Sequence, residues 1–437
     1  MRQAPEDMPG AGIPEGGQAP RVASQLQGAV ENGLHEPPGR PAEPAARPHQ
    51  LAIFAPNFNE LSQTFVHDHV KTLAPGHTVL LSLKDEGAAQ YGYPVLSHVQ
   101  PEFNDWGSLG SWPRYAFYRL RRRYGPALAL DNQMRVAEFL EAHGVTVMLA
   151  EFGPTGTLAG DVCQKLGIPL HVYFHGYDAS SSLHHPTVRR RYRRLFPQAA
   201  SIICASRYLG DRLVALGCPE RLVHVVPCGV DTGRFMPGKP RRGHILAVGR
   251  LVEKKAPHLT IRAFGAIAGR FPEARLDIVG EGPLWDLCTR TIAELGLEDR
   301  VTLHGAQSHA DCAALMRRAA IFAQHSVMDS EGNTEGLPVS ISEAMASALP
   351  VVATRHSGIP ESVREGITGL LVDEGDVDGM AAAFARLLED PDLGVRMGDA
   401  GRARAVELLD QAHIRERLRG IMGLPAPEGL VPRNAVS

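Results

Sequence analysis

Short apolar runs alternate with helix-like segments along most of the chain, and this alternation restricts the fold more than any other feature of the sequence. In the first half, from His49 onward, the apolar runs lie at 51–55, 78–83, 145–150, 169–174 and 201–205. Runs of four to six apolar residues are typical of strands that are buried on both faces of a parallel sheet. Helical segments such as 62–73 and 207–217 separate several of them. The first half therefore predicts a doubly wound α/β sheet.

The second half of the chain repeats this scheme. We expect strands at 244–249, 275–280, 301–305, 319–324 and 350–354. We expect helices at 257–269, 283–296, 309–318 and 337–348, and a C-terminal helix at about 405–422. The two runs meet near residues 235–243, which are rich in proline, glycine and charge, as interdomain linkers are. The prediction is an α/β protein with two Rossmann-like doubly wound domains that face an interdomain cleft.

The domain boundaries follow from the same pattern. Residues 1–48 hold nine prolines and seven glycines and are expected to be a disordered tail. Residues 49–237 and 238–408 are the two expected Rossmann-like domains, and residues 409–437 are expected to hold a C-terminal helix and tail.

Composition excludes several classes of protein. With 45 Lys and Arg against 48 Asp and Glu, the net charge of -3 argues against a dedicated nucleic-acid-binding protein. No apolar stretch reaches the roughly 18 residues that a membrane-spanning helix needs. The first residues lack the apolar core of a secretory signal, so we expect a cytoplasmic protein. None of the six cysteines forms a Cys-x-x-Cys pair, which favours free thiols over a structural zinc site.

Arginines gather in two clusters, 114–125 and 189–196, where they alternate with Tyr, Phe or Leu. Each cluster is consistent with a solvated helix face. Each is also consistent with a surface that contacts anionic lipid headgroups, at about 1 kcal/mol per basic residue. The second interpretation predicts peripheral contact with the inner face of a membrane.

The segment 331–361 carries the most informative pair of acidic residues. Glu335 lies in a glycine-containing loop, and Glu343 follows inside a helix that begins near Pro338. A helix that begins at the carboxyl end of a strand offers free backbone N–H groups and a positive dipole end to a phosphate. A carboxylate on that helix can accept hydrogen bonds from a ribose diol, and one in the loop can hold the hydroxyls of a sugar. Both residues are also compatible with surface glutamates around a helix cap.

Two further segments of the second half have a similar place at strand ends. Arg250 and Lys255 in VGRLVEKKA could neutralise a diphosphate, although loop cations are usually only solvated. Gly280 and Gly282 in VGEGPL resemble half of a dinucleotide fingerprint, but Trp285 at the last glycine position argues against NAD. A tight turn between strand and helix explains the two glycines equally well.

His175 follows a buried strand of the first half, in the segment YFHGYD. A histidine at this place can face the cleft. The feature alone slightly favours a core histidine that is satisfied by the backbone.

Taken together, these segments resemble the retaining glycosyltransferases of family four, which have the GT-B fold. The resemblance covers about residues 50–410, and its most specific element is Glu335 and Glu343 within EGLPVSISEAMA. VPCGVDTGRF at 226–235 and FHGYD add to it. Within the family the chain is similar to enzymes of exopolysaccharide assembly of the colanic-acid or amylovoran type.

The resemblance implies a hexosyltransferase with these roles at matching positions. Donor-binding residues would be Arg250, Lys255, Glu335, Gly336, Leu337, Glu343, Gly280 and Gly282. Catalytic residues would be His175 and Glu335, with His175 beside the anomeric centre. Acceptor-side residues would be Ser62, Thr64 and Asp178. Gly358 and Glu361 would shape the nucleotide site. Three departures are Ala256, where the family usually has Gly, Gln63, where it commonly has Glu, and APNFNELSQTF at 55–65, where many relatives have a glycine-rich first loop.

The function expected from the resemblance is the retaining transfer of a sugar from a nucleoside diphosphate sugar to a hydroxyl of a glycan or lipid-linked acceptor, in exopolysaccharide or cell-surface polysaccharide biosynthesis. No acidic cluster of the kind that holds Mg²⁺ stands out, so we expect neither metal nor cofactor. Three alternatives stay open. They are a sucrose- or trehalose-type synthase that uses a small soluble acceptor, a nucleotide-sugar epimerase or hydrolase, and a sugar-binding protein without turnover.

Overall fold

The apolar runs of the first half form one parallel sheet. The computed structural model describes residues 50–59, 64–99, 128 and 130–425. The strands are β1 (Leu51–Ala55), β2 (Thr78–Ser82), β3 (Val95–Leu96), β4 (Val147–Glu151), β5 (Leu170–Phe174), β6 (Ser201–Cys204) and β7 (Val223–Val225). They lie in the order β3-β2-β1-β4-β5-β6-β7, and all neighbours are parallel. Every residue of β1, β2, β4, β5 and β6 is buried, which explains the absence of polar alternation in these strands.

Helices cover this first sheet. They are α1 (Thr64–Thr72), α3 (Leu130–Ala142), α4 (Gly153–Leu166), α5 (Pro186–Leu195) and α6 (Arg207–Ala215). Helix α4 begins with a proline in its first turn and ends at Gly167, whose φ of 67° suits a left-handed cap. A Cβ on Gly156 would lie 2.7 Å from Val172 Cγ1, so glycine lets α4 approach β5 closely.

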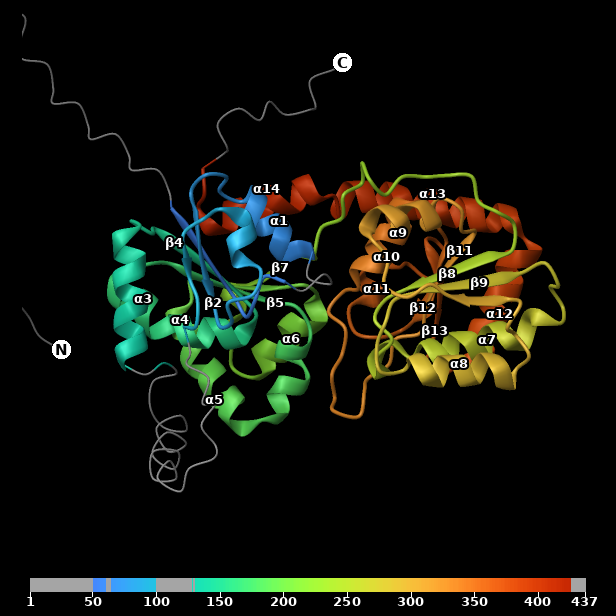
Figure 1. Ribbon diagram of the computed structural model, residues 1–437, viewed down its shortest axis with the longest axis horizontal. Coiled ribbons are helices and arrows are strands. Elements are labelled where there is room, and N and C mark those ends of the chain that lie inside the picture. The colour runs from blue at the N-terminus through green and yellow to red at the C-terminus, as the bar shows by residue number, and fades with distance from the viewer. Residues whose placement is uncertain (1–49, 60–63, 100–127, 129, 426–437) are drawn as a thin grey trace, which may run out of the picture. The chain divides into compact units, whose positions relative to one another are not determined.

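The second half forms another parallel sheet of the same kind (Figure 1). Its strands are β8 (His244–Val248), β9 (Arg275–Val279), β10 (Val301–Leu303), β11 (Ile321–Gln324), β12 (Val351–Thr354) and β13 (Gly369–Val372). The order is β10-β9-β8-β11-β12-β13, again with parallel neighbours. The sequence analysis missed β3, β7 and β13, which are short strands at sheet edges.

Helices lie on both faces of the second sheet. Helices α7 (Pro257–Ala268), α8 (Trp285–Glu294) and α12 (Val377–Glu389) cover one face, and α9 (His309–Met316), α10 (Val339–Ala346) and α13 (Pro391–Leu408) cover the other (Figure 1). A separate apolar core fills each side. The short helix α11 (Ile359–Ser362) follows β12. The strands and helices therefore confirm the predicted pair of doubly wound sheets.

The expected C-terminal helix at 405–422 is wrong as one continuous element. The chain forms α13 and then α14 (Gln411–Met422), with a break at residues 409 and 410. Val230 pairs with the chain at this break, because its N–H donates to Leu409 O at 2.8 Å and its O accepts from Gln411 N at 3.0 Å. Asp410 then caps α14 through Ala412 N at 2.9 Å. After the break, α14 packs against the core of the first half.

Several predictions fall outside the described residues. These are the disordered tail at 1–48, the residues Ser62 and Gln63, the arginine cluster at 114–125 and the end of the chain after residue 425. The boundaries expected at 237/238 and 408/409 stay predictions. Among the helices that the structure describes, none is both long and apolar enough to span a membrane.

Candidate functional site

The loops after β8, β9, β11 and β12 meet at the carboxyl edge of the second sheet. Gly280 and Gly282 follow β9 with φ of 135° and 155°. A Cβ would lie 2.0 Å from Gly249 O at the first position and 2.4 Å from Leu251 O at the second. Only glycine fits such conformations and such contacts. The two glycines therefore support the backbone on both sides of Arg250, and their predicted contact with a donor stays a prediction.

Glu335 is the buried acidic centre of this edge. Its Oε1 lies 3.4 Å from Lys255 Nζ and 3.6 Å from Lys254 Nζ. Burial alone would raise the pKa of the carboxyl, but the charges of Lys255 and Lys254 outweigh it and hold the pKa of Glu335 at about 2. Glu335 is therefore ionised at neutral pH and paired with two cations. The sequence analysis predicted Lys255 here and missed Lys254, although both lie in the same Glu-Lys-Lys turn.

Lys255 interacts electrostatically with the other three charged residues of the predicted donor site. Burial lowers the pKa of Lys255, the charge of Glu335 opposes this change, and the charges of Lys254 and Arg250 add to it. The same lysine lowers the pKa of Glu343. Lys255 thus interacts electrostatically with Arg250, Glu335 and Glu343, and a donor site shared by the four residues stays a prediction. The side chain of Arg250 is exposed and forms no ion pair with any residue that the structure describes.

The backbone around Glu335 is held by a histidine that the sequence analysis did not single out. Glu335 N donates to His356 Nε2 at 3.1 Å, and His356 Nδ1 donates to Glu374 Oε1 at 2.6 Å. Glu374 also accepts from Met328 N at 2.8 Å. The following amides, of Gly336 and Leu337, donate to no described residue and stand at the beginning of α10. Free amides at this position suit an anion.

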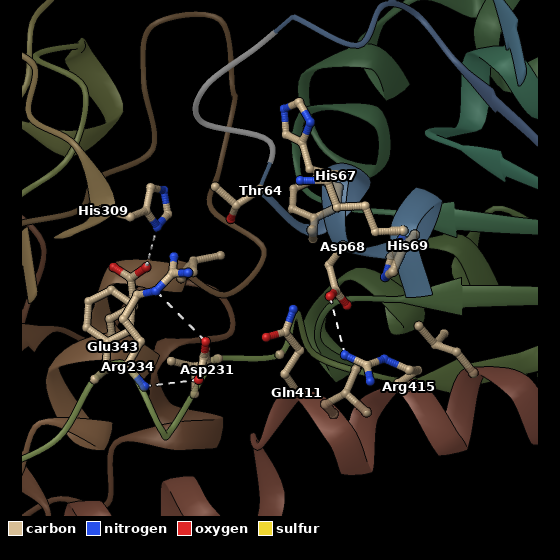
Figure 2. A pocket seen from close by; sticks show the side chains of 18 residues that line it. Thr64, His67, Asp68, His69, Asp231, Arg234, His309, Glu343, Gln411 and Arg415 are labelled. Carbon is tan, nitrogen blue, oxygen red and sulfur yellow. Dashed lines mark hydrogen bonds and ion pairs between the residues drawn. The ribbon is translucent and has the colours of Figure 1, made fainter. Parts of the chain in front are cut away.

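Glu343 has very different surroundings, because it faces a cavity of about 510 Å³. Burial raises the pKa of Glu343 to about 7, with Arg234 and Lys255 opposing the change. Figure 2 shows Glu343, Arg234 and His309 together at one side of the cavity, with His309 Nδ1 3.8 Å from Glu343 Oε1. The sequence analysis missed Arg234 and His309. Thr64, predicted for the acceptor side, lines the same cavity.

His175 lies at the carboxyl edge of the first sheet and is almost fully enclosed. Its side chain is 6% exposed, and Nε2 lies 2.8 Å from Glu151 Oε2. Phe65 stacks on the ring with centroids 4.1 Å apart. A Cβ on Gly336 would lie 2.1 Å from His175 O, so the Glu335 loop lies directly against this residue. The structure thus brings His175 and Glu335 into neighbouring segments, and the catalytic role of the imidazole stays a prediction.

Asp178 holds the loop that follows β5. It is fully buried, and its carboxylate accepts from the backbone N–H groups of His175, Gly176 and Gly153 at 3.0, 2.9 and 3.1 Å. These bonds make Asp178 a support for His175, and its acceptor-side role stays a prediction. Glu361 also has backbone partners, because it accepts from Arg207 N and Tyr208 N at 2.8 and 2.9 Å.

Metal ligands are not grouped in the part of the chain that the structure describes. No three His, Cys, Asp or Glu side chains there come together in a way that could hold a metal ion. The six cysteines are buried and unpaired with one another.

Comparison with known proteins identifies the family. Residues 42–234 match the model of Glycosyltransferase Family 4, and residues 234–404 match that of Glycosyl transferases group 1. The amylovoran biosynthesis glycosyltransferase AmsK of Erwinia amylovora is 33% identical over 62% of this chain and 68% of its own length. This chain belongs to glycosyltransferase family 4. The prediction made from the motifs is therefore confirmed.

Another family 4 relative is the putative colanic acid biosynthesis glycosyltransferase WcaL of Escherichia coli K12, 37% identical over 56% of this chain. The alignment spans 62% of WcaL, which is less than two thirds of its length. Among solved structures, Anabaena Alr3699/HepE in complex with UDP matches with a TM-score of 0.69 at 18% identity, over 86% of this chain and 99% of HepE. The family 4 chain thus has the GT-B fold that the sequence predicted.

Proposed function

We propose that this family 4 chain is a retaining hexosyltransferase that moves a sugar from a nucleoside diphosphate sugar to a hydroxyl of a glycan or lipid-linked acceptor. The observation that carries the proposal is the ionised Glu335, buried between Lys254 and Lys255 beside the exposed Arg250. Cations and a sugar-binding carboxylate within one edge of a sheet suit a sugar diphosphate. The relatives named for colanic acid and amylovoran synthesis support a role in exopolysaccharide assembly.

The charges suggest how the donor is activated. Lys255 and Arg250 would neutralise the diphosphate, and the free amides of Gly336 and Leu337 would donate to it. Charge grows on the diphosphate as the sugar becomes oxocarbenium-like, so groups that are already in place lower the barrier. Glu335 would accept hydrogen bonds from the sugar hydroxyls while Lys254 and Lys255 keep it ionised. Glu343 would accept from the ribose.

Retention follows if attack and departure use one face of the sugar. The bond between the anomeric carbon and the diphosphate oxygen breaks, and the acceptor oxygen bonds to the same carbon. The acceptor proton passes to the leaving phosphate oxygen, so the step needs no protein nucleophile and no metal.

The phosphate contacts are tested with Arg250→Ala and Lys255→Ala. A thermal-shift screen with UDP-, GDP-, ADP- and dTDP-sugars first identifies the donor, since a ligand at 100 times its Kd stabilises by about 2.7 kcal/mol. Each variant is expected to lower kcat/KM by about 100-fold or more. Lys239→Ala, in an exposed linker position, is the matched control. Unchanged donor binding and transfer in both variants would remove the assignment.

Helix α5 supports a further part of the proposal, peripheral contact of a cytoplasmic enzyme with an anionic membrane. Its arginines at 189, 190, 193 and 194 are exposed. Arg194 pairs with Asp161 at 2.9 Å, and Arg193 donates to Leu216 O at 3.1 Å. Wild type and a variant with residues 189, 190 and 194 changed to Gln are compared in co-sedimentation with phosphatidylglycerol vesicles. If wild type and variant bind the vesicles equally, at low salt and at high salt, the cluster is solvated surface.

A further inference from the structure

A fully buried carboxylate joins two histidines at the carboxyl edge of the first sheet. Glu151, the last residue of β4, is 0% exposed. Its Oε1 lies 2.6 Å from Nδ1 of His69, which belongs to α1, and its Oε2 lies 2.8 Å from His175 Nε2. We call these three residues the Glu151 bridge. The sequence analysis missed Glu151 and His69, which are 82 positions apart.

The bridge is charged. Burial would raise the pKa of Glu151, but the charge of His69 and the hydrogen bonds from both imidazoles hold it at about 2. Burial would lower the pKa of His69, yet the charge and hydrogen bond of Glu151 raise it. An ionised carboxylate only accepts hydrogen bonds, so each ring nitrogen that faces it carries a hydrogen. Both oxygens of Glu151 are thus used, and the hydrogen on each facing nitrogen is fixed.

The second nitrogen of His175 has a defined partner as well. His175 Nδ1 lies 3.7 Å from Cys228 Sγ, and burial raises the pKa of this thiol to about 12. The thiol therefore stays protonated and can donate its hydrogen to Nδ1. Phe65 and Tyr173 lie against the ring, with centroid distances of 4.1 and 4.2 Å. The tautomer and the plane of the imidazole are both determined by contacts.

The segments that the Glu151 bridge connects lie next to the Glu335 loop and the cavity that Glu343 faces. The carbonyl of His175 touches Gly336, next to Glu335, and Phe65 stands in the first turn of α1. His69 and Thr64, from the same helix, line the cavity that Glu343 faces. The bridge thus connects α1, the end of β4 and the backbone after β5, where the Glu335 loop is in contact.

We propose that Glu151 is a positioning residue for the transfer reaction, which fixes the tautomer and orientation of His175 and, through His69, the first turns of α1. Apolar side chains in place of the buried ion pair of Glu151 and His69 would fill the same space without the cost of burying charges. Packing alone therefore does not explain a carboxylate at position 151. The functional part of this inference depends on the proposed function. The claim about the two rings does not.

The first test replaces the carboxylate with its isosteric amide, Glu151→Gln. An amide accepts with its oxygen but donates with its nitrogen. One of the two histidines must therefore present a lone pair where it now presents N–H. We expect ¹⁵N spectra of histidine-labelled protein to show a changed ring nitrogen pattern for His69 or His175, assigned with single His→Asn variants. The matched control is His171→Gln on β5, because His171 is buried and, among the residues that the structure describes, its ring bonds to Ser201 Oγ at 2.7 Å and not to the Glu151 bridge.

Activity gives a second, separate readout. In Glu151→Gln we expect kcat to fall by about 100-fold, since misplacement by about 1 Å can cost that much. KM for the donor is expected to change less than threefold, because the donor contacts lie in the second half. Unaltered ring spectra in a folded Glu151→Gln protein, or unaltered kcat, overturns the proposal. If wild type transfers no sugar from any sugar nucleotide, the proposed function is contradicted instead. The ¹⁵N spectra still test whether Glu151 fixes the hydrogens on the two histidine rings.

A second pair of variants covers the case in which Glu151→Gln does not fold. His69→Asn keeps an N–H donor near the position of Nδ1, and His69→Leu removes it. We expect His69→Asn to retain at least tenfold more activity than His69→Leu at equal thermal stability. Equal kcat in the two variants overturns the positioning role.

Discussion

Lys255 Nζ lies 3.4 Å from Glu335 Oε1 at the carboxyl edge of the second sheet, where the two side chains are 15% and 10% exposed. Lys254 approaches the same oxygen from 3.6 Å. The carboxylate is therefore matched by more positive than negative charge before any ligand binds. A site with this surplus can accept the negative charge of a diphosphate without a new ion having to be buried alone.

The first prediction concerns the stability that Glu335 provides. Its folded pKa of about 2 lies below the ordinary 4.5, so its contribution is present above pH 4.5 and is lost as the pH falls toward 2. Glu335→Gln is expected to lower the free energy of unfolding at pH 7 by up to about 3 kcal/mol. Urea unfolding at pH 7, 5 and 3.5 should show the difference shrinking at the lowest pH. Glu331→Gln, at an exposed position of the same loop, is the control.

Glu343 gives the opposite dependence on pH. Its folded pKa of about 7 lies above the ordinary 4.5, so the folded protein loses stability as the pH rises from 4.5 to 7. Glu343→Gln is expected to be more stable than wild type at pH 8.5 by up to about 3 kcal/mol, and equally stable at pH 4.5. Glu294→Gln, at an exposed position of α8, should show neither effect. An equal gain in the free energy of unfolding at both pH values would contradict a raised pKa of the buried Glu343 carboxyl.

The sequence was sufficient for the strands of both sheets except β3, β7 and β13, because each of the others is a local pattern. A run such as LAIFA, buried on both faces, has no polar residue to interrupt it, and β1 begins and ends with that run. Candidate site residues could be selected from the sequence where they share one segment, as Glu335 and Glu343 do. Lys254 was overlooked because the sequence does not show that both adjacent lysines reach the same carboxylate.

Contacts between distant segments were not predictable in this way. Glu151 and His69 meet only because β1 and β4 are neighbours and α1 lies beside them. Asp410 is a local signal for the start of α14, but the pairing of Leu409 and Gln411 with Val230, about 180 residues earlier in the chain, has no local signal. Such pairs need the topology before their chemistry can be inferred.

Glu361 predicts a stabilising link between the two halves. Its carboxylate accepts from the first two N–H groups of α6, which otherwise have no partner within the helix. Glu361→Ala is expected to cost about 1 kcal/mol and to increase hydrogen exchange at Arg207 and Tyr208. Glu298→Ala, at an exposed site, is the comparison. Unchanged exchange at both amides would show that the cap contributes nothing.

Ala256 has the left-handed backbone, with φ 37° and ψ 50°, that a glycine adopts without strain. Relief of this strain is expected to offset the loss of the buried methyl group in Ala256→Gly. Ala382→Gly, at an exposed site inside α12, has no strain to relieve and should cost about 1 kcal/mol. In thermal unfolding, the free energy of unfolding of Ala256→Gly should therefore be about 1 kcal/mol higher than that of Ala382→Gly. Equal losses would argue against a strained Ala256.

His356 predicts how the Glu335 backbone is held. The N–H of Glu335 donates to His356 Nε2, so this nitrogen must be free of hydrogen, and Nδ1 donates to Glu374. His356→Gln keeps an acceptor for that N–H, whereas His356→Phe leaves a buried donor unpaired at a cost of about 1–3 kcal/mol. We expect urea unfolding to rank wild type above His356→Gln and His356→Gln above His356→Phe. Affinity for the donor should fall in the same order, from wild type to His356→Gln to His356→Phe. The reason is that the amide of Glu335 precedes the two free amides at the start of α10. If His356→Phe is as stable as His356→Gln and binds the donor equally well, the histidine does not hold this loop.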